Sequence, residues 1–275
     1  MVTGAIAYAR LQEEDPAALA RVLELLRQHP HYEALLRAPE DWRLDADDDL
    51  ALFMWAARWA DDVRSEPFDD YSEGWWHYVN YHYRDGRLTE PGNNDGRLLW
   101  ALNENHRGLA QGDAEDRAVA LTWMFHLVGD VHQPLHTIAN HAPAHPDGDR
   151  GGNLFHIRVS ENSDTINMHR LWDGLVIGTD RFTAVRQRGI DLRHRPGLTP
   201  PELEREAMDL DFESWARDGA QLAADYAYRG GTLRSGTREK GMVLPADYND
   251  TVQPLAEKRA TPAGYRLARI LGAAF

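Results

Sequence analysis

At two places outside the Pro- and Gly-rich stretch 139–153, a histidine stands four residues before an aspartate: His126 before Asp130, and His169 before Asp173. Residues four apart lie on the same face of a helix, so each pair can present an imidazole and a carboxylate at one place. The spacing therefore predicts two helical segments, each with a polar, ligand-type pair on one face.

A third histidine, His136, follows Pro134, which interrupts the helical period and allows the chain to turn His136 back toward the first pair. The chain has 13 histidines and no cysteine, so a metal here would be held by imidazole and carboxylate, a donor set that favours zinc first and then manganese or iron. One such pair alone is commonly only a local hydrogen bond or a weak ion pair. The residues around the first pair, 121–128, are largely apolar, and unpaired polar groups are costly to bury among them. The pattern therefore favours a metal site.

Composition limits the classes of function. The 275 residues are 43% hydrophobic, which suffices for a folded core, and no apolar run of about 18 residues could span a membrane. The formal net charge of −14 argues against a long basic groove that holds duplex DNA, although bound metal ions could still supply local positive charge. The absence of cysteine excludes disulfides. Residues 1–10 lack the features of a signal peptide and resemble an amphipathic helix that starts without a cap.

Most of the chain reads as helix. Asp15 and Pro16 form a helix start, an acidic run precedes a helix over residues 50–61, and Asp113 caps the helix that carries the first pair. Further helices are expected near residue 167, over 201–228 and from 252 to the end. Residues 139–153 are expected to form a loop, and 154–159 a short extended segment. One all-α domain over residues 1–275 is the simplest interpretation.

Two further segments carry polar residues beside apolar ones. Asp61 and Arg64 end an apolar run at 59–64, and His77, Tyr78 and Asn80 lie in an aromatic run. Taken singly, a helix-terminal aspartate is usually solvated and a histidine among aromatics is usually part of the core.

The order of these segments is more informative than any one of them. Residues 59–61 (Trp-Ala-Asp), 77–80 (His-Tyr-Val-Asn), 126–136, 148–153 (Gly-Asp-Arg-Gly-Gly-Asn) and 167–173 together resemble the zinc-dependent S1/P1 nuclease family, relatives of the bacterial zinc phospholipases C. The resemblance runs from about Ala5 to Ala268 and is most specific over 126–173. It implies a single-domain, all-helical fold of the zinc phospholipase C and P1 nuclease type.

The resemblance also implies a set of metal ligands, all of them imidazoles or carboxylates. They are Asp61, His77 and His126 for one zinc, Asp130 as a bridge to a second ion, and His136, His169 and Asp173 for another zinc. His132 belongs to the motif but is not a ligand in the family, so a packing role is expected for it.

Three further residues would act on the substrate. Arg64 matches the family's phosphate-binding arginine, Tyr78 its base-stacking residue and Asn80 its base-reading residue. The family more often has aspartate at the position of Asn80, so the base preference stays open. We expect Arg64 and Asp61 to be catalytic, with Asp61 acting as a ligand and not as a base.

The beginning of the chain departs from the family pattern. The family's third metal site uses the amino group and carbonyl of an N-terminal tryptophan and a nearby histidine, which precede a helix like that at residues 5–8. Here Met1 precedes that helix, with neither ligand. We expect either a two-zinc cluster or, in view of the uncapped helix, a start that omits a signal peptide and these ligands. Beginning at Met1, the chain should be a weak or inactive enzyme, because two-metal chemistry needs both ions.

The function implied is that of a phosphodiesterase, an endonuclease that cleaves single-stranded DNA or RNA to 5′-phosphorylated products by means of zinc-activated hydroxide, with 3′-nucleotidase activity as a further possibility. A secreted or periplasmic monomer that does not bind duplexes stably is expected. Three alternatives stay open: a zinc phospholipase C-like hydrolase, a metal-binding but catalytically impaired homologue, and a plain helical bundle whose His/Asp pairs are structural.

Overall fold

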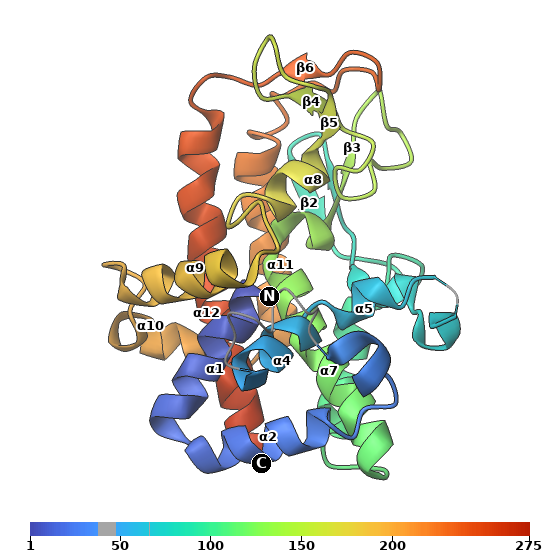
Figure 1. Ribbon diagram of the computed structural model, residues 1–275. Coiled ribbons are helices and arrows are strands. Elements are labelled where there is room, and N and C mark those ends of the chain that lie inside the picture. Colours follow the sequence, from blue (N-terminus) through green and yellow to red (C-terminus); the bar gives the residue numbers. More distant parts are fainter. Residues whose placement is uncertain (38–47, 66) are drawn as a thin grey trace.

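The computed structural model describes residues 1–37, 48–65 and 67–275, and most of them are helical (Figure 1). The helices are α1 (Val2–Glu14), α2 (Pro16–Leu26), α4 (Asp48–Ala56), α5 (Trp59–Asp62), α6 (Leu98–Gly108), α7 (Ala114–His132), α8 (Met168–Asp173), α9 (Phe182–His194), α10 (Pro200–Ala207), α11 (Phe212–Leu222) and α12 (Tyr248–Ala274). Short 3-10 or π turns are η1 (Tyr32–Leu36), η2 (Asp69–Tyr71), η3 (Gly74–His77), η4 (Pro134–Thr137) and η5 (Ala223–Ala227). The all-helical fold class predicted from the sequence is confirmed.

Helix α7 is the central element. Its N-cap is Asp113, whose side chain accepts hydrogen bonds from the backbone N–H groups of Glu115 and Asp116, as the sequence predicted. From Ala118 to Val131 almost every residue is buried, because α2, α5, α6, α11 and α12 all contact this helix. A helix that is apolar on all sides is stable only when it is surrounded in this way. The polar residues His126 and Asp130 are therefore held in a densely packed and ordered part of the protein.

Helix α1 packs along α12, the longest helix, and both pass close to the centre of the molecule (Figure 1). Gly264 allows this approach, since a Cβ atom at that position would lie only 2.5 Å from side-chain atoms of Ile6. The N-cap of α1, Met1, makes no side-chain capping hydrogen bond, in agreement with the uncapped start seen in the sequence. This packing brings the first turn of α1 beside α7.

Two small sheets accompany the helices. In the first, β1 (Tyr81–Arg84) pairs antiparallel with β2 (Arg87–Thr89) and parallel with β3 (Ile138–His141), in the order β2-β1-β3. In the second, β4 (His156–Arg158) lies between β5 (Ile166–Asn167) and β6 (Met242–Val243) at the end of the molecule remote from α2 (Figure 1). The extended segment expected at 154–159 thus contains β4. The prediction of a loop over 139–153 was wrong for its first three residues, because residues up to His141 belong to β3.

Two expected helices are interrupted. The run 50–61 divides into α4 and α5 at a turn in which the Arg58 N–H donates to the carbonyl of Trp55 and the Asp61 N–H to that of Arg58. The run 201–228 divides into α10 and α11, because the side chains of Asp209 and Asp211 accept hydrogen bonds from nearby backbone N–H groups and so compete with the helix. The last helix begins four residues earlier than expected, at Tyr248, and contains Pro254 and Pro262. Of the helices in the described ranges, none has the length and apolar character needed to cross a bilayer.

Candidate metal centre

The first group of candidate ligands comes from three elements. Asp61 lies on α5, His77 ends η3, and His126 and Asp130 lie one turn apart on α7. His77 Nδ1 is 2.9 Å from His126 Nε2, and each of these nitrogens is 3.0 Å from Asp130 Oδ2. The Asp61 carboxylate is 3.8 Å from His126 Nε2 and 4.0 Å from His77 Nδ1. Four ligand atoms thus converge within a few ångströms although their residues lie up to 69 positions apart in the chain.

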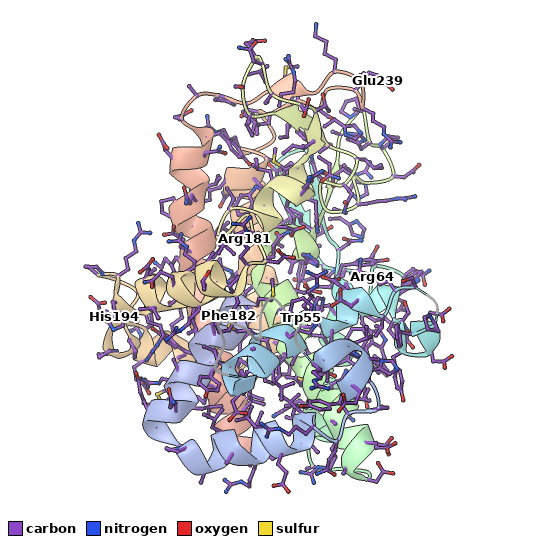
Figure 2. The ribbon with its side chains drawn as sticks, in the orientation of Figure 1. Trp55, Arg64, Arg181, Phe182, His194 and Glu239 are labelled. Atoms are coloured by element: carbon purple, nitrogen blue, oxygen red, sulfur yellow. The ribbon has the colours of Figure 1, made fainter. Side chains whose placement is uncertain are left out.

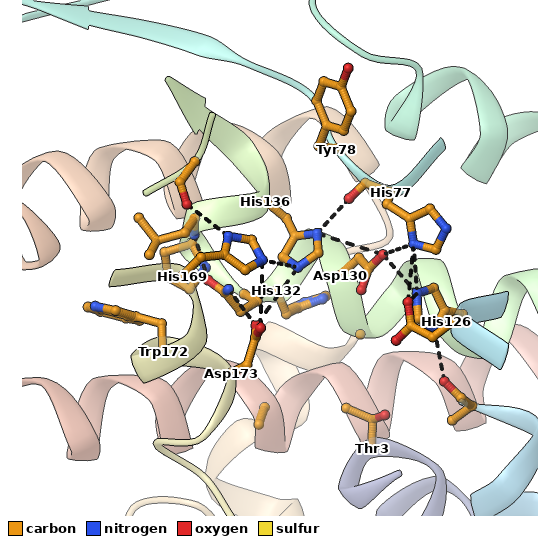
Figure 3. Close-up of a pocket in the computed structure, with 18 of the residues that line it drawn as sticks. Thr3, His77, Tyr78, His126, Asp130, His132, His136, His169, Trp172 and Asp173 are labelled. Carbon is orange, nitrogen blue, oxygen red and sulfur yellow. Dashed lines mark hydrogen bonds and ion pairs between the residues drawn. The ribbon is translucent and has the colours of Figure 1, made fainter. Parts of the chain in front are cut away.

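The second group lies beside the first. His136 belongs to η4, and His169 and Asp173 lie one turn apart on α8. His136 Nε2 is 3.1 Å from His169 Nε2 and 4.0 Å from Asp173, and His169 Nε2 is 3.7 Å from Asp173. Asp130 stands between the groups, since its Oδ2 is also 3.7 Å from His136 Nδ1. Figure 3 shows the two groups side by side with Asp130 between them.

Backbone carbonyls orient three of the four imidazoles. The Nδ1–H of His126 donates to the carbonyl of Ala57 (3.0 Å), that of His136 to His77 (2.6 Å), and that of His169 to Gly151 (2.8 Å). In each neutral ring this hydrogen bond places the proton on Nδ1, so the lone pair of Nε2 is free and faces the neighbouring candidate ligand. The fourth imidazole, His77, turns Nδ1 inward, and its buried Nε2 has no hydrogen-bond partner among the described residues. The donor set and the tautomers therefore fit divalent metal binding.

The loop 148–153 supplies one of these carbonyls. Gly151 has a φ of +60°, and a Cβ atom there would lie 2.2 Å from the carbonyl oxygen of Leu135, so only glycine fits. Asp149 is fully buried and anchors the loop by accepting hydrogen bonds from the Asn140 N–H and the Tyr228 hydroxyl. Burial raises the pKa of Asp149 despite these bonds. The Gly-Asp-Arg-Gly-Gly-Asn motif thus supports the second group and contributes no ligand side chain to it.

The electrostatics of the first group centre on Asp130. Burial alone would raise its pKa, but the imidazoles of His126 and His136 hold the pKa well below its usual range. Burial alone would lower the pKa of His126, yet the Asp130 carboxylate outweighs it and raises this pKa to about 9. Burial lowers the pKa of His77 and is also the main reason why the pKa of His169 is lowered. Asp130 is therefore an anion at neutral pH and stabilises positive charge beside it.

The remaining predicted residues lie in the same cavity, which has a volume of about 1420 Å³ and is also lined by Met1 to Thr3 of the α1 start. Arg64 follows α5, and its guanidinium is 2.5 Å from the Asp61 carboxylate and 3.1 Å from His77 Nδ1 (Figure 2). The ion-pair partner of Arg64 is thus Asp61. Glu66, two residues beyond Arg64 and another acidic neighbour in the sequence, lies outside the described residues. Tyr78 and Asn80 are half-buried, and the Tyr78 ring lies above the row of imidazoles (Figure 3).

Asn80 is fixed through the turn at residues 92–96. The Asn80 N–H donates to the Asp95 carbonyl, and the carboxylate of Asp95 accepts from the Gly92 N–H and from His82 Nε2. His82 Nδ1 in turn lies 2.8 Å from His141 Nε2. This chain of contacts, absent from the sequence interpretation, connects the segment that carries Asn80 to strand β3.

Two other members of the central motif act on their neighbours. Gln133 donates from its side chain to Asp173 (2.8 Å) and accepts from the Leu135 N–H, so it orients a candidate ligand. His132 is buried, donates from Nδ1 to the Val128 carbonyl, and accepts a hydrogen bond at Nε2 from Arg266 (2.6 Å). Its position agrees with the packing role expected for it. The orienting role of Gln133 has no spacing signal in the sequence and was missed.

Fold and site together define a helical protein with two adjacent His/His/Asp groups, each able to hold a metal ion. The family model described as S1/P1 nuclease matches residues 1–275, and the chain belongs to this family. The resemblance expected from the sequence is thereby confirmed.

Several characterised proteins align with this chain. Endonuclease 5 of Arabidopsis thaliana is 28% identical over 207 residues, which are 70% of this chain and 62% of that protein. Endonuclease 4 of the same plant is 27% identical over 239 residues, 80% of this chain and 72% of that protein. Nuclease S1 of Aspergillus oryzae (strain ATCC 42149 / RIB 40) is 23% identical over 246 residues, 81% of this chain and 79% of that protein. The alignment spans 62% of endonuclease 5 and only 49% of endonuclease 1 of Arabidopsis thaliana, so it leaves part of these relatives unmatched.

Proposed function

We propose that this chain is a metal-dependent phosphodiesterase that cleaves single-stranded DNA or RNA to products with a 5′-phosphate, and that it also hydrolyses 3′-nucleotides to nucleosides and inorganic phosphate. The observation that carries the proposal is the meeting of two His/His/Asp groups in one cavity with a buried carboxylate, Asp130, between them. Membership of a nuclease family supports the reaction class. We further propose that the chain acts as one domain over residues 1–275 and as a monomer.

The proposed metal is zinc, at two sites. Asp61, His77 and His126 would hold one ion, His136, His169 and Asp173 would hold another, and Asp130 would face the first. Imidazole and carboxylate donors without thiolate are the set that zinc uses in catalytic sites. When bound, zinc supplies positive charge against a phosphate and a water molecule that can be deprotonated near neutral pH. In the overall reaction water adds to phosphorus, and the bond from phosphorus to the 3′ oxygen breaks.

The protein's own groups position the substrate in this proposal. Arg64, at the edge of the first group and with a half-exposed side chain, would donate to the non-bridging oxygens of the phosphate, for which a guanidinium is geometrically suited. Tyr78 would stack on a base, and Asn80 would hydrogen-bond to one. In a chain with a net charge of −14, stacking on unpaired bases can replace the basic groove that duplex binding requires. We therefore propose single strands as substrates, without stable duplex binding, and a secreted or periplasmic location by analogy with the family.

Metal content and a substrate panel test the proposal together. Protein loaded with zinc and freed of excess ion should retain about two zinc ions per chain by elemental analysis, and the His126→Ala variant should retain fewer. The matched control is His194→Ala, since His194 is exposed on α9 and does not line the cavity (Figure 2). Fewer than one zinc ion per chain in the unmodified protein would refute the proposed metal centre.

The loaded protein should then be assayed on single-stranded DNA, single-stranded RNA, a 3′-mononucleotide, duplex DNA and phosphatidylcholine. We expect slow hydrolysis of the first three, in keeping with the weak activity expected for this chain, and still less of the last two. Hydrolysis of the lipid alone would identify a phospholipase C-like enzyme, and two bound zinc ions with no turnover would identify a catalytically impaired relative. Release of a 5′-hydroxyl with a 3′-phosphate would contradict the proposed direction of cleavage.

A further inference from the structure

An exposed tryptophan lies next to Tyr78 at the rim of the cavity. Trp75 is 52% exposed, an unusual state for the residue type with the largest apolar surface. Its ring centroid is 6.3 Å from that of Tyr78, and the two ring planes differ by only 32°. Gly74 before it and Tyr78 after it both line the cavity, so Trp75 extends the surface of the proposed site outward.

The backbone around Trp75 is held firmly although its ring is exposed. The Trp75 carbonyl accepts a hydrogen bond from the Arg97 N–H, and the Tyr78 carbonyl accepts one from the Leu98 N–H. The next residue, Trp76, packs in the other direction against Trp123, at 4.7 Å between ring centroids. Trp76 therefore anchors the segment in the core, and packing alone gives no reason for the outward ring of Trp75.

We propose that Trp75 is a second base-stacking platform, which binds the nucleotide next to the one held at Tyr78 in a single-stranded substrate. This inference rests on the proposed function. Two neighbouring rings, whose planes are tilted by 32° to each other, offer flat apolar faces in succession, as unstacked bases of one strand require. A base-paired duplex keeps its bases stacked on one another, so it cannot use either ring.

The charges at this rim suit a nucleic acid. Arg97, whose backbone is bonded to that of Trp75, is exposed, and no carboxylate among the described residues lies within ion-pair distance of it. Arg150 lines the cavity, is also exposed, and likewise has no carboxylate among the described residues within ion-pair distance. The Arg97 guanidinium lies over the ring of Trp100, 5.8 Å from its centroid, and the charge of Arg150 acts on Tyr78 against that of Asp95. In a strongly acidic chain these two guanidiniums supply positive charge near the segment 75–78 for the phosphates that join successive bases.

Binding measurements on short oligothymidylates test the platform without depending on catalysis. The probes are a hydrolysis-resistant thymidine 3′-thiophosphate, phosphorothioate oligomers of two and four nucleotides, and a short-chain phosphatidylcholine, each added to the zinc-loaded protein. In Trp75→Ala we expect unchanged affinity for the mononucleotide and about tenfold weaker affinity for the two oligomers, the size expected for the loss of one base–aromatic stack. Trp75→Phe should restore most of the loss, because the ring face is kept. Tyr226→Ala, which removes another exposed ring that does not line the cavity, is the control and should bind like the unmodified protein.

The outcomes separate this inference from the proposed function. Oligomer binding that depends on Trp75 without hydrolysis by the unmodified protein would refute the proposed function and leave the platform in place. The platform would be overturned if the unmodified protein hydrolyses single strands while Trp75→Ala binds every probe as tightly as the unmodified protein does. If Trp75→Ala loses affinity for the mononucleotide as much as for the oligomers, the ring serves the first subsite and the platform is overturned. If the variant loses affinity only for a short-chain phosphatidylcholine, the ring serves a lipid headgroup, which overturns the platform as well.

Discussion

The zinc affinity of the first group should rise steeply between pH 7 and pH 9. His126 can bind a metal through Nε2 only after it loses a proton, and Asp130 outweighs the effect of burial and raises the pKa of His126 to about 9. At pH 7 the ring is therefore protonated, two pH units below its pKa. Half of the rings are still protonated at pH 9, so Kd at pH 7 should be about fiftyfold larger than at pH 9, which corresponds to about 2 kcal/mol. His77 adds nothing to this slope, since burial lowers its pKa and its ring is already neutral.

The assay isolates the first group in a His169→Ala background, which removes one ligand of the second group. Zinc is titrated at pH 7, 8 and 9 against a chromophoric chelator whose own pH dependence is known, and Kd should fall about ninefold from pH 7 to pH 8 and about fivefold from pH 8 to pH 9. The control is an additional His29→Gln change, because burial lowers the pKa of His29 to about 3 and that ring does not titrate in this range. A Kd that is constant from pH 7 to pH 9 would refute the reasoning, since it would mean that Asp130 does not hold a proton on His126 in the metal-free protein.

Other perturbations have separate readouts. Arg64→Ala should reduce turnover by about 10²-fold at unchanged zinc content, because one charged donor to the transition state is lost; equal turnover would make Arg64 only the ion-pair partner in the structure. Gln133→Ala should weaken zinc binding by about tenfold in chelator competition, because Asp173 loses the donor that orients it. Arg266→Met should lower the free energy of unfolding by about 2 kcal/mol in urea denaturation, because it leaves Nε2 of His132 buried without a partner. Removal of zinc by a chelator should lower Tm, with recovery on adding zinc back, since the metal binds the folded state alone.

The candidate ligands could be predicted from their spacing in the sequence, whereas the groups that hydrogen-bond to them could not. A separation of four residues fixes His126 and Asp130 on one helical face whatever the rest of the chain does, and Asp113 and Pro16 marked helix starts because their effects are local. The carbonyl that orients each imidazole comes from a residue far away in the chain, such as Ala57 for His126. No local rule predicts such a pairing, so it became visible only in the folded structure.

The errors in the sequence interpretation share a cause. Strand β3 was expected to be loop because its four residues, Ile138–His141, are too few for an alternating pattern, and its pairing partner β1 lies more than 50 residues earlier. The helix expected over 201–228 ended early because Asp209 and Asp211 accept hydrogen bonds from the backbone, a choice that helical propensity alone does not decide. In both places a contact specific to this chain prevailed over the average preference of the residues.

The two histidines of helix α7 show why a motif does not define a site by itself. His126 and His132 lie on the same helix, and both are buried. Asp130 outweighs the burial of His126 and raises its pKa, so that ring sits in an environment that stabilises a cation and can exchange its proton for a metal. Burial, together with the charges of Arg259 and Arg266, holds the pKa of His132 well below its usual range, so that ring stays neutral and accepts a hydrogen bond from Arg266. A metal ion at His132 would be repelled by two buried guanidiniums, whereas at His126 the Asp130 carboxylate would attract it. The charges around each ring therefore decide which histidine of the motif can be a ligand. Helix α12 places two arginines beside His132, and α7 itself places Asp130 beside His126.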